Sequence, residues 1–160
     1  MRKKNDARGE RGVTISEGVR SADPAEAAAL YIELGWGTSA RYSSMRMKKA
    51  LEGCDVVISA HNSAGELVGL LRALTDSTLD TKVLDLVVAP EYQRQGIGVR
   101  MMDRLARHPR VRGTTVYFET ERRNFGFAAK CGYAPRKGLT VFSAKNSVRS
   151  SNGARGKGSR

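Results

Sequence analysis

The chain has 160 residues and a formal net charge of +12, with 40% hydrophobic and 6% aromatic residues. This length predicts one domain with a sizeable core, and the composition is that of a globular rather than a disordered or membrane-spanning protein. Its longest apolar runs, such as 56–58 and 86–89, are far too short to cross a bilayer, and no apolar segment of a signal peptide follows the charged first residues. We therefore expect a cytoplasmic protein without membrane contact.

The positive charge is concentrated at the two ends of the sequence. Residues 1–12 hold five basic and two acidic side chains, and residues 145–160 hold five basic side chains and no acidic one. Both ends are rich in Gly, Ser and Asn and poor in apolar residues, so burial cannot offset the entropy of ordering them. We expect basic flexible tails at 1–11 and 145–160 around one domain at 12–144. Such tails favour solubility, with weak, non-specific binding of polyanions as the alternative.

The first part of the domain predicts an edge strand and two helices. Residues 13–19 show the broken alternation of an edge strand. A helix begins after Asp23, which can accept from the free backbone amides, with a proline at the first helical position and Glu26 completing a capping-box-like pair. This helix runs to about Leu34, and a second helix spans about 44–52.

The remainder predicts a mixed sheet with helices on both faces. Short apolar or alternating runs predict strands, and two segments with helical periodicity predict helices. The expected strands are 55–61, 66–74, 82–89, 114–120 and 139–144, and the expected helices are 96–107 and 123–130. The fold class is therefore α+β, an α/β/α sandwich with a central sheet of about six to seven strands.

The clearest chemical signal follows the buried strand that ends near Val88. A short turn leads into two glycines and an amphipathic helix. The first amides of such a helix lack an intrahelical partner, and the helix dipole favours negative charge there, so the segment predicts a diphosphate site. Gly96 and Gly98 would let the backbone approach phosphate oxygens, and Arg94 and Arg100 would add charge-assisted contacts. The alternative is a glycine turn that merely caps a helix.

The loop differs from two common nucleotide motifs and resembles a third. A Walker A loop requires Gly-Lys-Ser/Thr, which is absent, and a Rossmann fingerprint requires a glycine where Met101 stands. The pattern Gln-x-x-Gly-x-Gly at 93–98, after a strand ending in Val-x-Pro, resembles the acetyl-CoA motif of the GNAT superfamily of N-acetyltransferases. Segments 67–76 and 84–88 are similar to plant and cyanobacterial serotonin (arylalkylamine) N-acetyltransferases, and 127–133 occupies the family's F-Y-E-K-x-G-F/Y segment.

The resemblance covers about residues 13–144 and implies the GNAT fold, acetyl-CoA as acyl donor and no metal. It also implies direct attack of a primary amine on the thioester, whose oxygen would receive a backbone amide near Val87 or Val88. The residues expected to bind the acyl donor are Leu86, Val87, Val88, Gln93, Arg94, Gln95, Gly96, Ile97, Gly98, Val99, Arg100, Asn124, Phe127 and Lys130.

The three candidates for catalysis are Asp85, Glu119 and Tyr133. Asp85 is the one charge between Val83 and Val88 and would serve as general base if it points inward; the alternative is that it faces solvent or pairs with Arg72 or Lys82. Glu119 would bind a cationic amine, or else is a solvent-facing charge at a strand end. The family's usual tyrosine acid is absent here.

That tyrosine is replaced by Ala128. Tyr133, Tyr117 or a water would then protonate the leaving thiolate, or the thiolate would leave unassisted, or activity would be impaired. Trp36 and Tyr42 lie between the first two helices, where GNAT enzymes admit substrate, and would wall the amine pocket; core packing is the competing account of Trp36.

Two of the listed cofactor residues have equally plain explanations. Asn124 would hydrogen-bond the pantetheine arm, with a simple helix cap as the alternative. Lys130 would approach the phosphates, with a solvated lysine as the alternative.

The preferred function is transfer of an acetyl group to a small-molecule amine. A protein or peptide acetyltransferase, and an RNA-associated or catalytically weakened acetyl-CoA-binding module, are the alternatives. The last is suggested by the basic tails and Ala128, but a core net charge of +4 over 13–144 and the lack of aromatic-rich basic motifs argue against it. Edge strands of this fold often pair between copies, which allows a homodimer.

Overall fold

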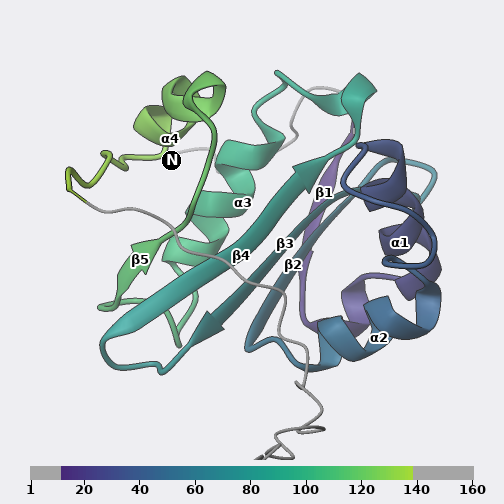
Figure 1. Cartoon of the computed structure of the whole chain (residues 1–160), viewed down its shortest axis with the longest axis horizontal. Helices are drawn as coiled ribbons and strands as arrows, with labels where there is room; N and C mark the ends of the chain where they lie inside the picture. The colour runs from purple at the N-terminus through teal and green to yellow at the C-terminus, as the bar shows by residue number, and fades with distance from the viewer. Residues whose placement is uncertain (1–11, 139–160) are drawn as a thin grey trace, which may run out of the picture.

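The computed structural model describes residues 12–138, which form a five-stranded sheet with helices on both faces (Figure 1). The expected tails and the strand expected at 139–144 lie outside the described residues. The strands follow one another across the sheet in chain order; neighbours from β1 to β4 are antiparallel, and β4 and β5 are parallel. The predicted mixed sheet and element order are confirmed, with five strands in the described part instead of six or seven.

The strands are β1 (Thr14–Glu17), β2 (Val56–His61), β3 (Leu67–Thr75), β4 (Asp80–Val88) and β5 (Thr115–Tyr117). The helices are α1 (Pro24–Glu33), α2 (Ser44–Glu52), α3 (Ile97–Ala106) and α4 (Phe125–Lys130), with short 3-10 turns η1 (Val19–Ser21), η2 (Pro90–Tyr92) and η3 (Arg122–Asn124).

Asp23 caps the start of α1, as predicted from the sequence. One Asp23 carboxylate oxygen accepts hydrogen bonds from the amides of Ala25 (2.8 Å) and Glu26 (3.0 Å). The predicted capping box was wrong, because the Glu26 carboxylate instead accepts from the amide of Leu67 at 3.3 Å. That bond ties the first turn of α1 to the beginning of β3.

The core lies between the sheet and the helices on each face. The stripe expected on α3 is confirmed, since its four apolar side chains are all at most 2% exposed: Ile97, Met101, Met102 and Leu105. Gly69 of β3 lies against this helix, and a Cβ added there would be 3.2 Å from the sulfur of Met101. The close approach of α3 to the sheet therefore depends on the missing side chain.

A register shift in the β3–β4 ladder decides which way the centre of β4 faces. Arg72 pairs with Asp85, whereas the next residue, Ala73, pairs with Val83, so Leu84 is the extra residue of a bulge. Because cross-strand partners share a face of the sheet, Asp85 lies on the same face as Arg72. Tyr31 of α1 packs on that face and donates a hydrogen bond to Asp85.

The sheet opens between β4 and β5. Only Asp80, Thr81 and Lys82, at the start of β4, pair with β5. In the described part of the chain, the rest of the β4 edge on this side has no strand beside it. Figure 1 shows β5 and β4 diverging toward the end of β4 at which α3 begins.

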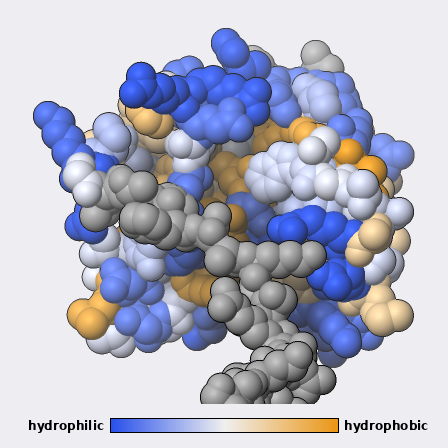
Figure 2. Space-filling model, viewed as in Figure 1, coloured by the Kyte–Doolittle hydropathy of each residue, from blue (hydrophilic) through white to orange (hydrophobic). Residues whose placement is uncertain are grey.

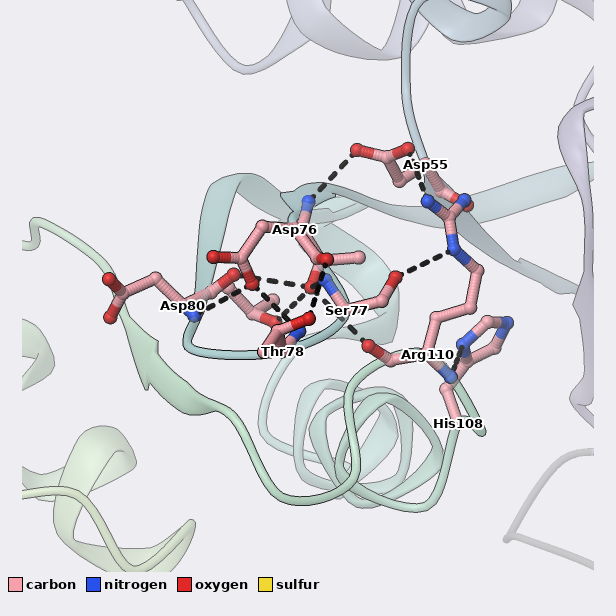
Figure 3. A network of polar contacts seen from close by, with 9 residues as sticks. Asp55, Asp76, Ser77, Thr78, Asp80, His108 and Arg110 are labelled. Atoms are coloured by element: carbon pink, nitrogen blue, oxygen red, sulfur yellow. Dashed lines mark hydrogen bonds and ion pairs between the residues drawn. The ribbon is translucent and has the colours of Figure 1, made fainter.

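The far end of the sheet is held by a polar network around the β3–β4 turn (Figure 3). One oxygen of Asp76 accepts from the backbone amides of Thr78 (2.8 Å), Leu79 (2.7 Å) and Asp80 (3.0 Å). Arg110, after α3, donates to Asp55 at 2.8 Å and to the Ser77 hydroxyl at 3.0 Å. Hydrogen bonds of Asp76 and Arg110 thus join three segments: the β3–β4 turn, the beginning of β2 and the segment after α3.

This network predicts a loss of stability in acid. Hydrogen bonds from backbone amides, above all that of Thr78 for Asp76 and that of Thr75 for Asp55, lower the pKa of both carboxyl groups. A lowered folded-state pKa contributes stability above the unfolded pKa of about 3.9, and that contribution disappears as pH falls through the folded pKa. Thermal melts of the Asp55→Asn/Asp76→Asn variant should give a lower Tm than the wild type at pH 7, with the difference shrinking below pH about 4. A constant difference would contradict the assignment.

Candidate functional site

The loop from β4 to α3 is braced by two glutamine side chains. Gln93 donates to the Val88 carbonyl at 2.9 Å, and Gln95 donates to the Glu91 carbonyl at 2.8 Å. These bonds replace strand pairing at the end of β4 and fix how the chain turns toward α3. Gln93 therefore has a structural role in addition to the predicted one in ligand binding.

The backbone at the start of α3 offers a group of free amides. Arg94 and Gly96 have left-handed φ values of 64° and 78°, which turn the chain sharply before the helix. The first helical bond runs from the Arg100 amide to the Gly96 carbonyl at 3.0 Å. Within residues 12–138, the amides from Arg94 to Gly98 donate to no protein group.

This geometry fits an anion. No heavy atom outside the immediate neighbours lies within 4 Å of the position that a Gly96 Cβ would take, so a group can approach the backbone there. Adjacent free amides and the positive end of a ten-residue helix both favour negative charge. The loop therefore fits the diphosphate of a coenzyme, with the exposed Arg94 beside it.

Gly98 has a different reason to be glycine from the one expected. A Cβ at this position would lie 3.1 Å from the ring of Phe127 and 3.6 Å from Leu86. The space is thus filled by α4 and β4 side chains, which pack against the first turn of α3. The Phe127 ring therefore packs against the first turn of α3 at Gly98. The expected direct contacts of Gly98 and Phe127 with the ligand stay predictions.

Arg100 points toward β1. Its guanidinium donates to the Val13 carbonyl at 3.0 Å, and its other terminal nitrogen is buried without a hydrogen-bond partner in the described part of the chain. The residue also lines a hollow beside β1 and α3. This position does not support the phosphate contact expected from the sequence.

The free edge of β4 presents one backbone donor next to the loop. The Ala89 amide donates to the Val68 carbonyl of β3 at 2.8 Å, and successive amides of a strand point to opposite sides. Val87, which pairs with Leu70, therefore points its amide to β3, whereas the amide of Val88 faces the open side. Of the two donors considered from sequence, the geometry selects Val88.

Hydrophobic surface accompanies this open side. Figure 2 shows orange, hydrophobic atoms sunk in the middle of the face, with blue, hydrophilic side chains around them. Leu84 of β4 is 40% exposed. An apolar floor with a polar rim is the usual lining of a small-molecule site.

Asp85 belongs to a buried cluster with Arg72 and Tyr31. Arg72 donates to one Asp85 oxygen at 2.5 Å through Nη2 and to both through Nε, at 3.1 and 3.2 Å. Tyr31 donates to the same carboxylate at 2.5 Å. The side chains of Arg72 and Asp85 are 13% and 6% exposed. The alternative that Asp85 pairs with Arg72 is the arrangement observed.

Asp85, the residue expected to be the general base, acts in this structure as a hydrogen-bond acceptor for Tyr31 and Arg72. Both carboxylate oxygens of Asp85 accept hydrogen bonds, from Tyr31 and Arg72 on one oxygen and from Arg72 on the other. Burial, and then the Asp85 charge, raise the pKa of the Tyr31 phenol. Asp85 is thus placed to hold Tyr31 and Arg72 in position.

Two aromatic rings pack against Tyr31. The Trp36 ring meets it edge-on with centroids 5.5 Å apart, and the Tyr42 ring lies tilted at 5.0 Å. Trp36 is 47% exposed, so the core-packing account of this residue is wrong. Trp36 and Tyr42 form an aromatic wall beside the buried cluster, and their contact with substrate stays a prediction.

Glu119 lies away from the end of β4. β5 ends at Tyr117, so Glu119 is beyond the strand, contrary to the expected strand 114–120. Its carboxylate is 55% exposed and forms an ion pair with Lys82, near the start of β4. The hydrogen bond from Lys82 lowers the pKa of Glu119. Glu119 is therefore a solvent-facing charge, which is the alternative considered from the sequence.

Tyr133 lies beside the position of the missing tyrosine. Its amide donates to the Ala128 carbonyl at 2.9 Å, and its ring meets Phe118 edge-on at 5.2 Å. Burial, followed by the nearby Cys131, raises the pKa of its phenol. The phenol therefore keeps its proton at neutral pH, as an acid must.

The remaining two candidates lie at the two ends of α4, Asn124 just before it and Lys130 as its last residue. Asn124 occupies the N-cap position but makes no cap bond; its side chain donates to the Thr120 hydroxyl at 3.0 Å, so the cap alternative was wrong. Lys130, the last residue of α4, is exposed, which agrees with the solvated alternative. Contact of either with a ligand stays a prediction.

Two of the residues at the site were not assigned a role from sequence. Tyr31 was given no function, and Arg72 was named only as a possible partner for Asp85. An isolated arginine within the apolar stretch 67–75 was the available signal, because a charge in such a strand requires a partner.

No helix of residues 12–138 is long and apolar enough to cross a membrane. No three His, Cys, Asp or Glu side chains in the same part cluster as metal ligands would.

The sequence of this chain is similar to those of known acetyltransferases. The model of the acetyltransferase (GNAT) family matches residues 26–133. The chain is 36% identical to the chloroplastic serotonin N-acetyltransferase 2 of Oryza sativa subsp. japonica over 98 residues, which are 59% of this chain and 49% of that protein. It is 29% identical to a histone acetyltransferase of Glycine max over 89 residues, 49% of this chain and 37% of that protein.

The chain thus spans half or less of the length of these two relatives. A solved GNAT-family acetyltransferase of Streptococcus pneumoniae is similar over nearly its whole length. It is 26% identical with a TM-score of 0.66, covering 83% of this chain and 99% of that one.

Proposed function

This chain belongs to the GNAT acetyltransferase family, and we propose that it transfers the acetyl group of acetyl-CoA to a primary amine of a small molecule. The observation that carries the proposal is the group of free amides from Arg94 to Gly98 beside the open edge of β4. One end of the loop would hold the diphosphate, and the strand edge would hold the reacting end.

The residues divide the work of acyl transfer among them. Acetyl-CoA, when bound, supplies a thioester that an amine can attack. The Val88 amide would donate to the thioester oxygen as it becomes anionic, and Tyr133 would supply a proton to the departing thiolate. The open side of the sheet would hold amine and thioester in line.

Removal of the proton from the amine has no dedicated carboxylate base in this proposal. An ammonium has no lone pair, and a lysine-like amine has a pKa of about 10.4, so a proton must leave before attack. Asp85 is fully engaged by Arg72 and Tyr31. We therefore assign this step to water and assign Asp85 to positioning.

The acceptors named for the relatives of this chain differ. One relative acts on serotonin and another on histones. The aromatic wall of Trp36 and Tyr42 beside the site favours a small acceptor with an apolar part. A protein or peptide acceptor is the second candidate.

Titration of the purified full chain with acetyl-CoA tests the proposal, together with release of the coenzyme thiol over a panel of amines. We expect saturable one-to-one binding and thiol release with at least one small primary amine. Binding without turnover on any small amine, but with turnover on peptides, would favour the second candidate. Absence of binding would overturn the assignment of the loop.

A further inference from the structure

A half-open hollow of about 470 Å³ lies between α2, the segment before it and β3. It is separate from the acyl-donor loop, on the face of the sheet that α1 and α2 cover. Its lining residues are Arg41, Tyr42, Met45, Arg46, Met47, Lys49, Ala50 and Arg72.

The charge of this hollow is one-sided. Four of its eight lining residues are basic and none is acidic. Arg72 is neutralised by Asp85, but Arg41, Arg46 and Lys49 take part in no ion pair within residues 12–138.

A second hollow of similar size shows the contrast. It lies beside β1 and α3, measures about 450 Å³ and also contains three arginines. Two of these are paired with carboxylates of the same lining, Arg104 with Glu17 and Arg107 with Asp103. Arg100 donates to a backbone carbonyl. Two of the three arginines in this second hollow are therefore neutralised by carboxylates of the protein itself.

Two of the free cations near α2 are held in place. Arg46 donates through Nε to the Arg41 carbonyl at 3.0 Å, which braces the segment that leads into α2. The Arg41 guanidinium lies over the Tyr42 ring, 5.5 Å from its centroid. Like charges gathered in one hollow repel each other, and an anion bound among them would relieve that repulsion.

The hollow connects with the centre of the site through Arg72. This residue lines the hollow and also binds Asp85, and Tyr42 both lines the hollow and packs on Tyr31. Asp85 precedes Val88 by three residues in β4, a distance of roughly 10 Å along a strand. An acceptor whose amine is near Val88 can therefore extend toward the hollow along the aromatic wall.

We propose that this hollow binds an anionic group of the acceptor, so that the acceptor is a primary amine that also carries a carboxylate or a phosphate. The inference rests on the proposed acetyl transfer and names the class of its acceptor. The Tyr42 ring and the buried Met47 would contact the apolar part that separates amine and anion.

Matched pairs of amines test the acceptor class. O-phosphotyramine is compared with tyramine, and para-carboxyphenethylamine with phenethylamine, so that each pair differs in one anionic group. We expect kcat/KM for thiol release to be at least about tenfold higher for an anionic member, since its anion would gain charge-assisted contacts with the free cations of the hollow. The pair with the larger ratio distinguishes phosphate from carboxylate.

A charge-matched pair of variants locates the effect. Arg41→Gln/Lys49→Gln removes two cations from the hollow, and Lys48→Gln/Arg112→Gln removes two exposed cations that do not line it. The first variant should lose about tenfold in the preference for the anionic amine, and the second should keep it. Acetyl-CoA affinity should be the same in both, which shows that both are folded.

Equilibrium binding separates this inference from the proposed function. Calorimetric titration with O-phosphotyramine in the absence of acetyl-CoA requires no turnover and should show binding that Arg41→Gln/Lys49→Gln weakens. Turnover with equal kcat/KM for both members of each pair would overturn the anionic acceptor while the acetyltransferase stands. Binding of a single-stranded RNA oligonucleotide that only the hollow variant loses, without preference for O-phosphotyramine over tyramine, would also overturn it.

Discussion

Replacing Gly96 by glutamate is expected to lower the affinity for acetyl-CoA by a factor of about 100 or more, with little loss of folded protein. The new carboxylate would stand at the free amides of α3 and repel the diphosphate, and a loss of about 3 kcal/mol of binding energy corresponds to this factor. Titration calorimetry of variant and wild type measures the ratio directly.

Asparagine at the same position is the matched control. Gly96 has a φ of 78°, a conformation that asparagine tolerates better than other side chains, and no atom outside its neighbours lies within 4 Å of its Cβ position. Gly96→Asn should therefore keep most of the affinity for acetyl-CoA. If both variants bind as the wild type does, the diphosphate does not lie at this loop.

Elements that depend on neighbouring residues were predicted well from the sequence. α2 was expected at 44–52 and is found at Ser44–Glu52, because a serine caps its first turn and a glycine follows its end. The start of α1 after Asp23 and the apolar stripe of α3 were found for the same reason. Caps, periodicity and glycines act over a few residues, so the local sequence contains them.

Features that depend on pairing across the sheet were predicted less well. β5 was expected to span 114–120 but has three residues, because the opening of the sheet after Lys82 decides where its pairing stops. The direction of Asp85 follows from a bulge between β3 and β4, which the alternation of residues in one strand cannot show. Arg100 donates to the carbonyl of Val13, just before β1, and these two residues are 87 positions apart in the sequence.

The loop was the part of the site that sequence reasoning located best. Its glycines and the following helix are contiguous in the sequence, so the free amides could be predicted from the sequence alone. The acceptor side is assembled from α1, α2, β3 and β4, and its key contacts join Tyr31, Arg72 and Asp85 across 54 and 13 residues of sequence. Such contacts require the fold.

Replacing Asp85 by leucine is expected to destabilise the protein by about 3–5 kcal/mol, which is a large part of the stability of a small domain. The change leaves the Arg72 guanidinium, 13% exposed, and the buried Tyr31 hydroxyl without their shared acceptor. Urea unfolding followed by circular dichroism gives the free energy of unfolding of each variant.

A triple variant tests whether the loss comes from unpaired groups. Tyr31→Phe/Arg72→Met/Asp85→Leu removes both donors together with the acceptor and should regain most of the stability, because an apolar cluster of similar volume has no stranded charge. If the triple variant is as unstable as Asp85→Leu, packing rather than pairing explains the effect.

Asp85→Asn then separates positioning from proton transfer, because its side chain has nearly the same shape. A general base at this position would make kcat fall by a factor of about 10²–10⁴ with unchanged acetyl-CoA affinity, and the acidic limb of the pH profile of kcat/KM would disappear. Positioning predicts instead a lower free energy of unfolding and a moderate fall in kcat, with the shape of the pH profile retained. The second outcome is favoured because both carboxylate oxygens already accept hydrogen bonds from Arg72 and Tyr31, and because the Asp85 side chain is only 6% exposed to an incoming amine.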